Sequence, residues 1–235
     1  MRKYLLATAA LAVLAASPAS AAVVFTDGFE GDTPKLNANP LDKWTVTGQV
    51  DVVTDPNGFG ITITAPASGN IVDLDGSPGP GEITMKDSYG FNAGDLVSLS
   101  FVLGGSQRNN GNNNYFVKFI FAGIQDVADG VGTGLLSGLP SGGPFAPTVT
   151  LNGTIGSSAA FATSSYSFRA VNAGTIKLAF GTSSGDNIGP LLDNVSLSVG
   201  AIPEPATWAM MIMGFGLIGG ALRSRKRVGV RFAAV

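Results

Sequence analysis

The central part of the sequence, residues 22–201, predicts an all-β fold, specifically an antiparallel β-sandwich. Three observations predict it: the region is rich in Gly, Thr, Ser, Asn and Val, its apolar residues alternate over short runs, and no run has a helical period. Its length of about 180 residues suits one domain with a sizeable core. Low charge and frequent turn residues therefore favour short strands over packed helices.

About ten segments have the composition of strands, because Val, Thr and aromatic residues dominate them and Gly, Asn, Asp and Pro separate them. We expect strands over residues 23–26, 44–53, 61–64, 71–74, 96–103, 115–121, 148–151, 165–170, 175–180 and 192–199. Residues 106–114 are expected to form a polar turn or exposed loop. The Gly- and Pro-rich residues 130–147 predict a long surface loop.

Residues 1–21 have the three parts of a signal peptide. The positively charged residues Arg2 and Lys3 precede an apolar run. Ala19 and Ala21 are the small residues that signal peptidase needs at its subsites. The apolar run has about 13 residues, which is too short to span a membrane comfortably. We therefore expect export from the cytoplasm, with signal peptidase as a processing partner.

A second apolar stretch, residues 206–222, predicts one C-terminal transmembrane helix. It contains no charged residue, and at about 1.5 Å per residue it reaches about 25 Å, slightly less than a hydrocarbon core of about 30 Å. Trp208 suits the membrane interface. The basic cluster that follows marks the cytoplasmic side by the positive-inside rule, and it consists of Arg223, Arg225, Lys226 and Arg227.

The residues around this stretch resemble the PEP-CTERM sorting signal in its PEPxxWA form. The matching residues are Pro203, Glu204, Pro205, Trp208 and Ala209, followed by glycines and the basic cluster. The resemblance covers residues 202–227. It implies recognition by exosortase, a membrane cysteine protease-transferase that cleaves near Pro-Glu-Pro and passes the protein to the cell surface or matrix. Residues 228–235, a basic and apolar tail, extend further than usual in that family; a plain membrane anchor is the alternative.

From this resemblance we expect an exported bacterial cell-envelope or extracellular-matrix protein. It would be anchored in the inner membrane before processing and then reach the cell surface, outer envelope or matrix, in association with exopolysaccharide or biofilm. The middle region carries seven of the 14 basic and 15 of the 16 acidic residues, so nucleic acid is not expected as a partner. The chain has no Cys and no His, which removes the usual catalytic base and thiolate chemistry, and we do not expect an enzyme.

The middle region also resembles jelly-roll, galactose-binding-like domains, which are related to carbohydrate-binding modules. The matching segments occur in order, at residues 27–30, 72–76, 99–105 and 189–197. The resemblance implies a jelly roll with a structural Ca²⁺ between its first and last strands. Glu30 and Asp193 match the positions that supply carboxylates, and Asp27 is a third candidate ligand. The alternative is that these carboxylates cap turns by accepting backbone N–H bonds.

Two other functions stay open. The domain is alternatively a lectin-like, glycan-binding module, with Trp44, Tyr89, Phe91 and Tyr115 as candidate aromatic contacts, although the alternation around Trp44 favours a core position. A secreted hydrolase with paired carboxylates is less expected, because 15 acidic residues give many unspecific pairs.

The segment Asp-Leu-Asp-Gly at residues 73–76 has the spacing of a calcium loop. Leu74 alternates with Val72, however, and this alternation favours a strand that runs into a turn.

Overall fold

The computed structural model describes residues 21–109, 111–123, 127–128, 148–170, 172–201 and 205–223. The described residues between 21 and 201 belong to one compact unit, and the helix at 205–223 belongs to a second. The predicted signal peptide up to residue 20, including Ala19, lies outside the described residues. So do the whole loop expected over 130–147 and the residues after Arg223.

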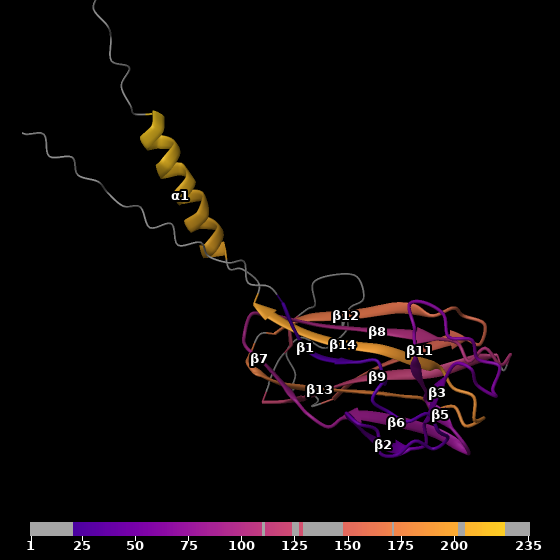
Figure 1. Cartoon of the computed structure of the whole chain (residues 1–235). Coiled ribbons are helices and arrows are strands. Elements are labelled where there is room, and N and C mark those ends of the chain that lie inside the picture. The colour runs from indigo at the N-terminus through magenta and orange to yellow at the C-terminus, as the bar shows by residue number, and fades with distance from the viewer. Residues whose placement is uncertain are drawn as a thin grey trace, which may run out of the picture. The chain divides into compact units, whose positions relative to one another are not determined.

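The first sheet has the strand order β10-β12-β8-β14-β4-β3, and β1 also pairs with β14 (Figure 1). Its strands are β1 (Ala22–Asp27), β3 (Asp51–Thr54), β4 (Asn70–Asp73), β8 (Asp95–Gly104), β10 (Val127–Ala128), β12 (Ala162–Ala170) and β14 (Leu191–Ala201). One side of β14 pairs with β8. The other side pairs with β4 near its beginning and with β1 further along, so the first and last strands lie side by side.

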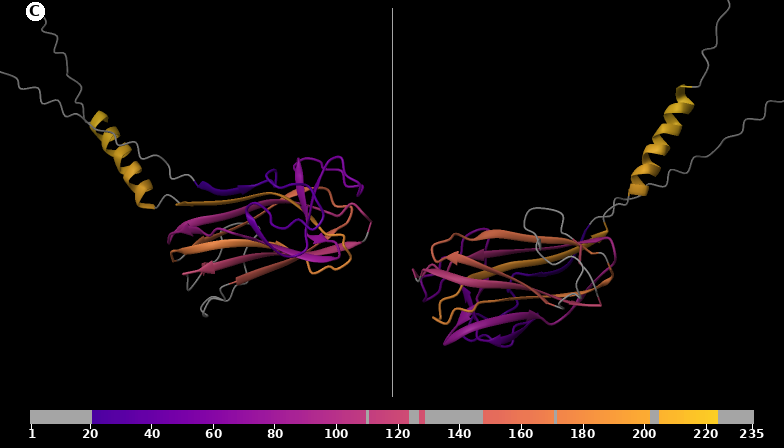
Figure 2. Two further views of the ribbon diagram at one scale, coloured as in Figure 1. Left: turned by 60° about the horizontal axis from the view of Figure 1, so that its bottom comes forward. Right: turned by 180° about the vertical axis from the view of Figure 1, so that it is seen from behind.

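The second sheet has the order β11-β9-β13-β6-β2, with β5 paired to β6 and β7 paired to β13. Its strands are β2 (Trp44–Gly48), β5 (Asp75–Gly76), β6 (Gly79–Met85), β7 (Tyr89–Phe91), β9 (Asn112–Ala122), β11 (Thr148–Gly156) and β13 (Gly174–Gly181). Figure 2 shows the two sheets as stacked layers. All these pairings are antiparallel, so the predicted antiparallel β-sandwich is confirmed.

The core between the sheets is built around Trp44, whose side chain is fully buried. Its ring centroid lies 5.4 Å from that of Phe25, 6.1 Å from that of Phe29 and 5.9 Å from that of Phe180. These spacings are typical of packed aromatic pairs, and large aromatic side chains contribute most to core burial. The prediction that Trp44 is a core residue is therefore confirmed, and Phe91 is buried as well.

The strand expected over residues 44–53 is in fact two strands in different sheets. β2 pairs with β6 of the second sheet, whereas β3 pairs with β4 of the first. Gly48, at the end of β2, has a φ of 73°, a conformation that interrupts a strand and that glycine adopts at little cost. Alternation identifies extended chain, but it carries no information about where the chain changes sheets.

Residues 61–64 alternate as predicted but do not form a strand. Ile61 is buried and Thr62 is exposed, yet the Thr62 N–H donates to Gln107 Oε1 at 2.9 Å rather than to a neighbouring strand. The Ile63 N–H likewise donates to Asp55 Oδ2 at 2.9 Å. Side chains thus replace the sheet ladder here, which satisfies the backbone donors equally well.

The sequence prediction also missed β6 and β7. β6 begins with Gly79, Pro80 and Gly81, which are residues that usually mark a turn. Its remaining residues alternate as a strand should, since Ile83 and Met85 are buried and Thr84 between them is partly exposed.

The C-terminal helix α1 spans Pro205–Arg223, which coincides with the stretch predicted over 206–222. Within the described part of the chain, no helix is long and apolar enough to cross a membrane. The predicted transmembrane character of this stretch is therefore not confirmed.

Candidate functional site

The end of β1, the turn after it and an irregularity in β14 bring acidic side chains together beside the first and last strands, and the loop before β4 supplies a backbone donor. The register between β14 and β8 shifts between Asp193 and Ser196. Asp193 is fully buried there. Its Oδ2 accepts the Ser68 N–H at 3.0 Å, and its Oδ1 accepts the Asn194 N–H at 2.6 Å. The irregularity thus turns a carboxylate inward, where both of its oxygens accept backbone N–H groups.

Glu30 extends from the turn after β1 to the loop before β4. Its Oε1 accepts the Asn70 N–H at 3.2 Å. The carboxylate lies directly over Gly69, where an added Cβ would come within 1.9 Å of Oε1. The Asn70 side chain ties the same two segments together, because its Nδ2 donates to the Phe29 carbonyl at 3.1 Å and to the Asp32 carbonyl at 2.8 Å.

Asp27 ends β1 and is buried. Its Oδ2 accepts the Trp44 indole N–H at 2.6 Å, and its Oδ1 accepts the Phe29 N–H at 3.1 Å. The ammonium of Lys43 lies 3.5 Å from Oδ1. Asp27 therefore caps the first turn, anchors the core tryptophan and pairs with a cation.

The pKa of Asp193 is raised to about 6, chiefly because burial disfavours its charged form. The N–H donors of Ser68 and Asn194 lower it, whereas the negative charges of Glu30 and Asp27 raise it. Glu30 and Asp27 are therefore each close enough to Asp193 to repel its charge. Among the described residues, however, no group of three or more Asp or Glu side chains converges closely enough to hold a metal ion.

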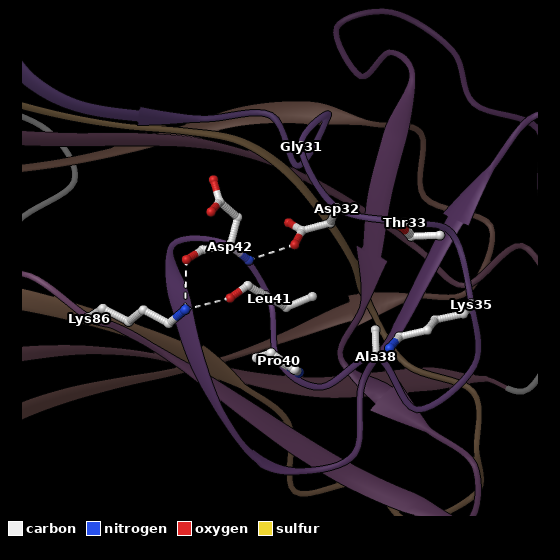
Figure 3. Close-up of a pocket in the computed structure, with 9 residues that line it drawn as sticks. All are labelled: Gly31, Asp32, Thr33, Lys35, Ala38, Pro40, Leu41, Asp42 and Lys86. Carbon is white, nitrogen blue, oxygen red and sulfur yellow. Dashed lines mark hydrogen bonds between the residues drawn. The ribbon is translucent and has the colours of Figure 1, made fainter.

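A polar pocket of about 340 Å³ lies at the loop between β1 and β2, and Figure 3 shows its lining. Asp32 Oδ1 accepts the Asp42 N–H at 2.7 Å. Its Oδ2 is buried and has no hydrogen-bond partner. Burial is the main cause of the raised pKa of Asp32. Lys86 also lines the pocket, and its Nζ donates to the carbonyls of Leu41 and Asp42 at 2.8 and 2.7 Å.

A second pocket, of about 290 Å³, is lined by Val24, Phe25, Thr26, Lys43, Asp87 and Tyr89. Asp42 and Lys86 line the first pocket, and the next residue after each, Lys43 and Asp87, lines the second. The two pockets are therefore neighbours. Sequence reasoning did not find them, because no motif connects residues contributed by one loop and by the chain that follows β6.

The residues of the sorting motif are only partly described. Pro203 and Glu204, as well as Arg225, Lys226 and Arg227, lie outside the described residues. Pro205 is the first residue of α1 and Arg223 the last, and Trp208 and Ala209 lie in its first half. Proline fits the first helical turn, where its missing N–H has no partner to lose.

Comparison with known proteins gives one match of sequence and several of structure. Residues 201–226 match the family model described as the PEP-CTERM protein-sorting motif. No curated protein matches the sequence.

Similar solved structures include a cleaved adhesin domain of Lys-gingipain from Porphyromonas gingivalis, with 14% identity, 74% of this chain and 96% of that chain covered, and a TM-score of 0.41. The xylan-binding domain from CBM 22 shares 15% identity over 77% of this chain and 94% of its own, with a TM-score of 0.40. A CBM61 module in complex with β-1,4-galactotriose shares 15% identity over 73% of this chain and 93% of its own, with a TM-score of 0.39.

Proposed function

Residues 201–226 carry a PEP-CTERM protein-sorting motif, and from it we propose that the chain is a non-enzymatic protein of the cell envelope or extracellular matrix. The motif indicates an exported protein that exosortase processes. Cleavage near Pro203-Glu204-Pro205 would separate the β-sandwich from the helix and the basic cluster. The motif match is the observation that carries this proposal. Mass spectrometry of the surface-exposed protein tests it: a C-terminus close to Glu204 is expected, and an intact C-terminus at Val235 would contradict it.

The route to that location involves two further steps, which we propose from the sequence. Signal peptidase cuts after Ala21, and residues 206–222 hold the precursor in the inner membrane with the basic cluster on the cytoplasmic side. N-terminal sequencing of the exported protein is expected to begin at Ala22. A mature chain that still begins at Met1 would contradict the first step.

A glycan-binding role for the sandwich is a second candidate, and the paired pockets favour it. Asp32 Oδ2 is a buried acceptor without a partner, and a sugar hydroxyl is a donor that would satisfy it. Tyr89 is half-buried and lines the second pocket, where its ring packs against that of Phe25 and would contact a second sugar unit. The ligand class would be a polysaccharide such as the exopolysaccharide of the same cell. A glycan array on the full chain tests this role, and an array without any bound polysaccharide would contradict it.

We also propose that Glu30 and Asp193 hold a structural Ca²⁺ between the first and last strands. Two carboxylates repel each other there, and backbone carbonyls and water would complete the six to eight oxygens that Ca²⁺ takes. Asp27 is bound to Trp44 and Lys43, so it fits the ion less well. A chelator is expected to lower the melting temperature of the wild-type protein, but not that of Glu30→Gln. An unchanged wild-type melting temperature would rule the ion out.

A further inference from the structure

We propose that the pocket at the loop between β1 and β2 takes a sugar with a free amino group, so that the sandwich binds an amino-sugar polymer. This inference rests on the glycan-binding role proposed above and deepens it by naming the class of ligand. It concerns the pocket that Asp32 and Lys86 line, and it does not depend on the sorting role.

Asp32 lines the pocket with a carboxylate oxygen that the protein leaves unsatisfied. The residue is only 9% exposed. Its Oδ1 accepts the Asp42 N–H at 2.7 Å, whereas its Oδ2 is buried and has no hydrogen-bond partner among the described residues. Buried polar atoms are almost always paired. A ligand that fills the pocket must therefore donate a hydrogen bond to this oxygen.

The charge around Asp32 is negative, and a neutral hydroxyl donor would not offset it. Burial is the main cause of the raised pKa of Asp32, and the negative charges of Asp27 and Asp42 raise it further. The Asp42 carboxylate lies over Gly31, where an added Cβ would be 3.5 Å from its Oδ2, and Figure 3 shows it next to the Asp32 side chain. An ammonium donor would satisfy the hydrogen bond and offset the charge together.

The lysines of the pocket do not supply that ammonium. Lys86 Nζ donates to the carbonyls of Leu41 and Asp42 at 2.8 and 2.7 Å (Figure 3). Its charge lowers the pKa of Asp32, but neither Lys86 nor Lys35 forms an ion pair with a pocket carboxylate in the described part of the chain. The pocket therefore keeps two carboxylates to which no cation is bonded.

The shape of the site favours sugar rings over the lysine side chain of another protein. The pocket has a volume of about 340 Å³, and the neighbouring pocket one of about 290 Å³, so successive units of a polymer could occupy both. In the second pocket the rings of Tyr89 and Phe25 lie 5.7 Å apart and provide an apolar wall. A sugar ring packs on such a wall, whereas a single alkyl chain would leave most of it uncovered.

The charge of the whole domain supports the same class of ligand. Residues 22–201 carry 15 acidic and seven basic side chains. A surface of net negative charge attracts a polymer that carries many ammonium groups and repels one that carries carboxylates. The domain therefore favours a cationic polysaccharide over an acidic one.

Calorimetric titration of the full chain, purified in detergent, tests this class with two oligomers of equal length. One consists of glucosamine and the other of N-acetylglucosamine, so acetylation removes the positive charge while the sugar backbone stays the same. We expect the acetylated oligomer to bind about tenfold more weakly. Asp32→Asn keeps the shape of the side chain without its charge, and it should bring the two affinities close together.

Asp186→Asn is the matched control, because it removes one negative charge from an exposed side chain that lines neither pocket. It should bind the glucosamine oligomer as tightly as the wild type does. An equal loss of affinity in Asp32→Asn and Asp186→Asn would show that only the overall charge attracts the oligomer, and the proposal would be overturned. Equally tight binding of a lysine peptide with the same number of charges would overturn it as well.

The outcomes separate the ligand class from the glycan-binding role itself. A wild-type chain that binds the two oligomers equally, or that binds only neutral or acidic polysaccharides on a glycan array, overturns the amino-sugar assignment and leaves the glycan-binding role intact. A wild-type chain that binds no polysaccharide overturns both.

Discussion

The carboxylate of Asp193 on β14 accepts a hydrogen bond of 3.0 Å from the backbone N–H of Ser68, which lies 125 residues earlier in the chain. This contact joins the last strand to the loop that leads into β4. It also keeps a fully buried carboxylate beside Glu30, and repulsion between the two contributes to the raised pKa of Asp193. The same contact therefore links fold stability, pH and any bound cation.

The stability of the protein in chelator should fall as pH rises from about 4 to about 6. The pKa of Asp193 is about 6 in the folded chain and 3.8 as the reference value, so the folded state binds more protons than the unfolded state in this window. At about 1.4 kcal/mol per pKa unit, Asp193 lowers the free energy of unfolding by about 3 kcal/mol over this window. Urea unfolding at several pH values measures it.

Asp193→Asn is the control for this pH effect, because its side chain has no charge to lose. The slope of stability against pH between 4 and 6 should become shallower in the variant, while the contribution of Asp73, whose pKa is also raised, remains. An identical slope in variant and wild type would show that Asp193 is not the titrating group.

Gly69→Ala should destabilise the protein more than Gly60→Ala does. Both glycines have positive φ angles, 64° and 75°, and alanine pays about 1 kcal/mol in that conformation. At Gly60 an added Cβ meets no atom within 4 Å, whereas at Gly69 it collides with the Glu30 carboxylate. Glu30 must swing away and lose its bond to Asn70, an additional cost of about 1 kcal/mol.

A double-mutant cycle with Glu30→Ala checks the origin of this additional cost. In the Glu30→Ala background, Gly69→Ala should cost no more than Gly60→Ala, as measured by denaturant unfolding. If the difference between the two glycines persists without the Glu30 carboxylate, the collision is not its cause.

Asp32→Asn and Tyr89→Ala should each weaken binding of the cell's own exopolysaccharide. Loss of one charged acceptor or of one stacking ring costs about 1–2 kcal/mol, which corresponds to roughly a tenfold loss of affinity. Calorimetric titration of the full chain measures it. Thr150→Ala, an exposed change on β11, is the matched control. Equal affinity in Asp32→Asn, Tyr89→Ala and the control would place the glycan elsewhere.

The strands that alternate in sequence were predictable, because one face of each packs on the core. Leu99 and Phe101 of β8, or Val117 and Phe119 of β9, are buried while the residues between them are not. β6 was missed because Gly79, Pro80 and Gly81 suggest a turn, and the break after Gly48 was missed because alternation does not reveal a change of sheet.

The candidate site residues also differ in whether the sequence predicted them. Glu30 and Asp193 were named from a resemblance over ordered segments, and the structure brings them close enough to interact. Asp32 and Lys86 come from separate segments whose approach depends on the folded path of the loop between β1 and β2, and no spacing predicts it. The segment at residues 73–76 does run from a strand into a turn, as its alternation indicated.

Cell-surface display of a variant with an altered sorting motif tests the central claim most directly. The variant carries Pro203→Ala, Glu204→Gln and Pro205→Ala, and Thr207→Ala, a position the motif leaves open, is the matched control. Fractionation and immunoblotting compare the surface fraction and size of each protein. We predict that the triple variant stays with the inner membrane at its unprocessed size, while the control is processed and displayed. A triple variant with the same processed size and surface fraction as the wild type would contradict the sorting account.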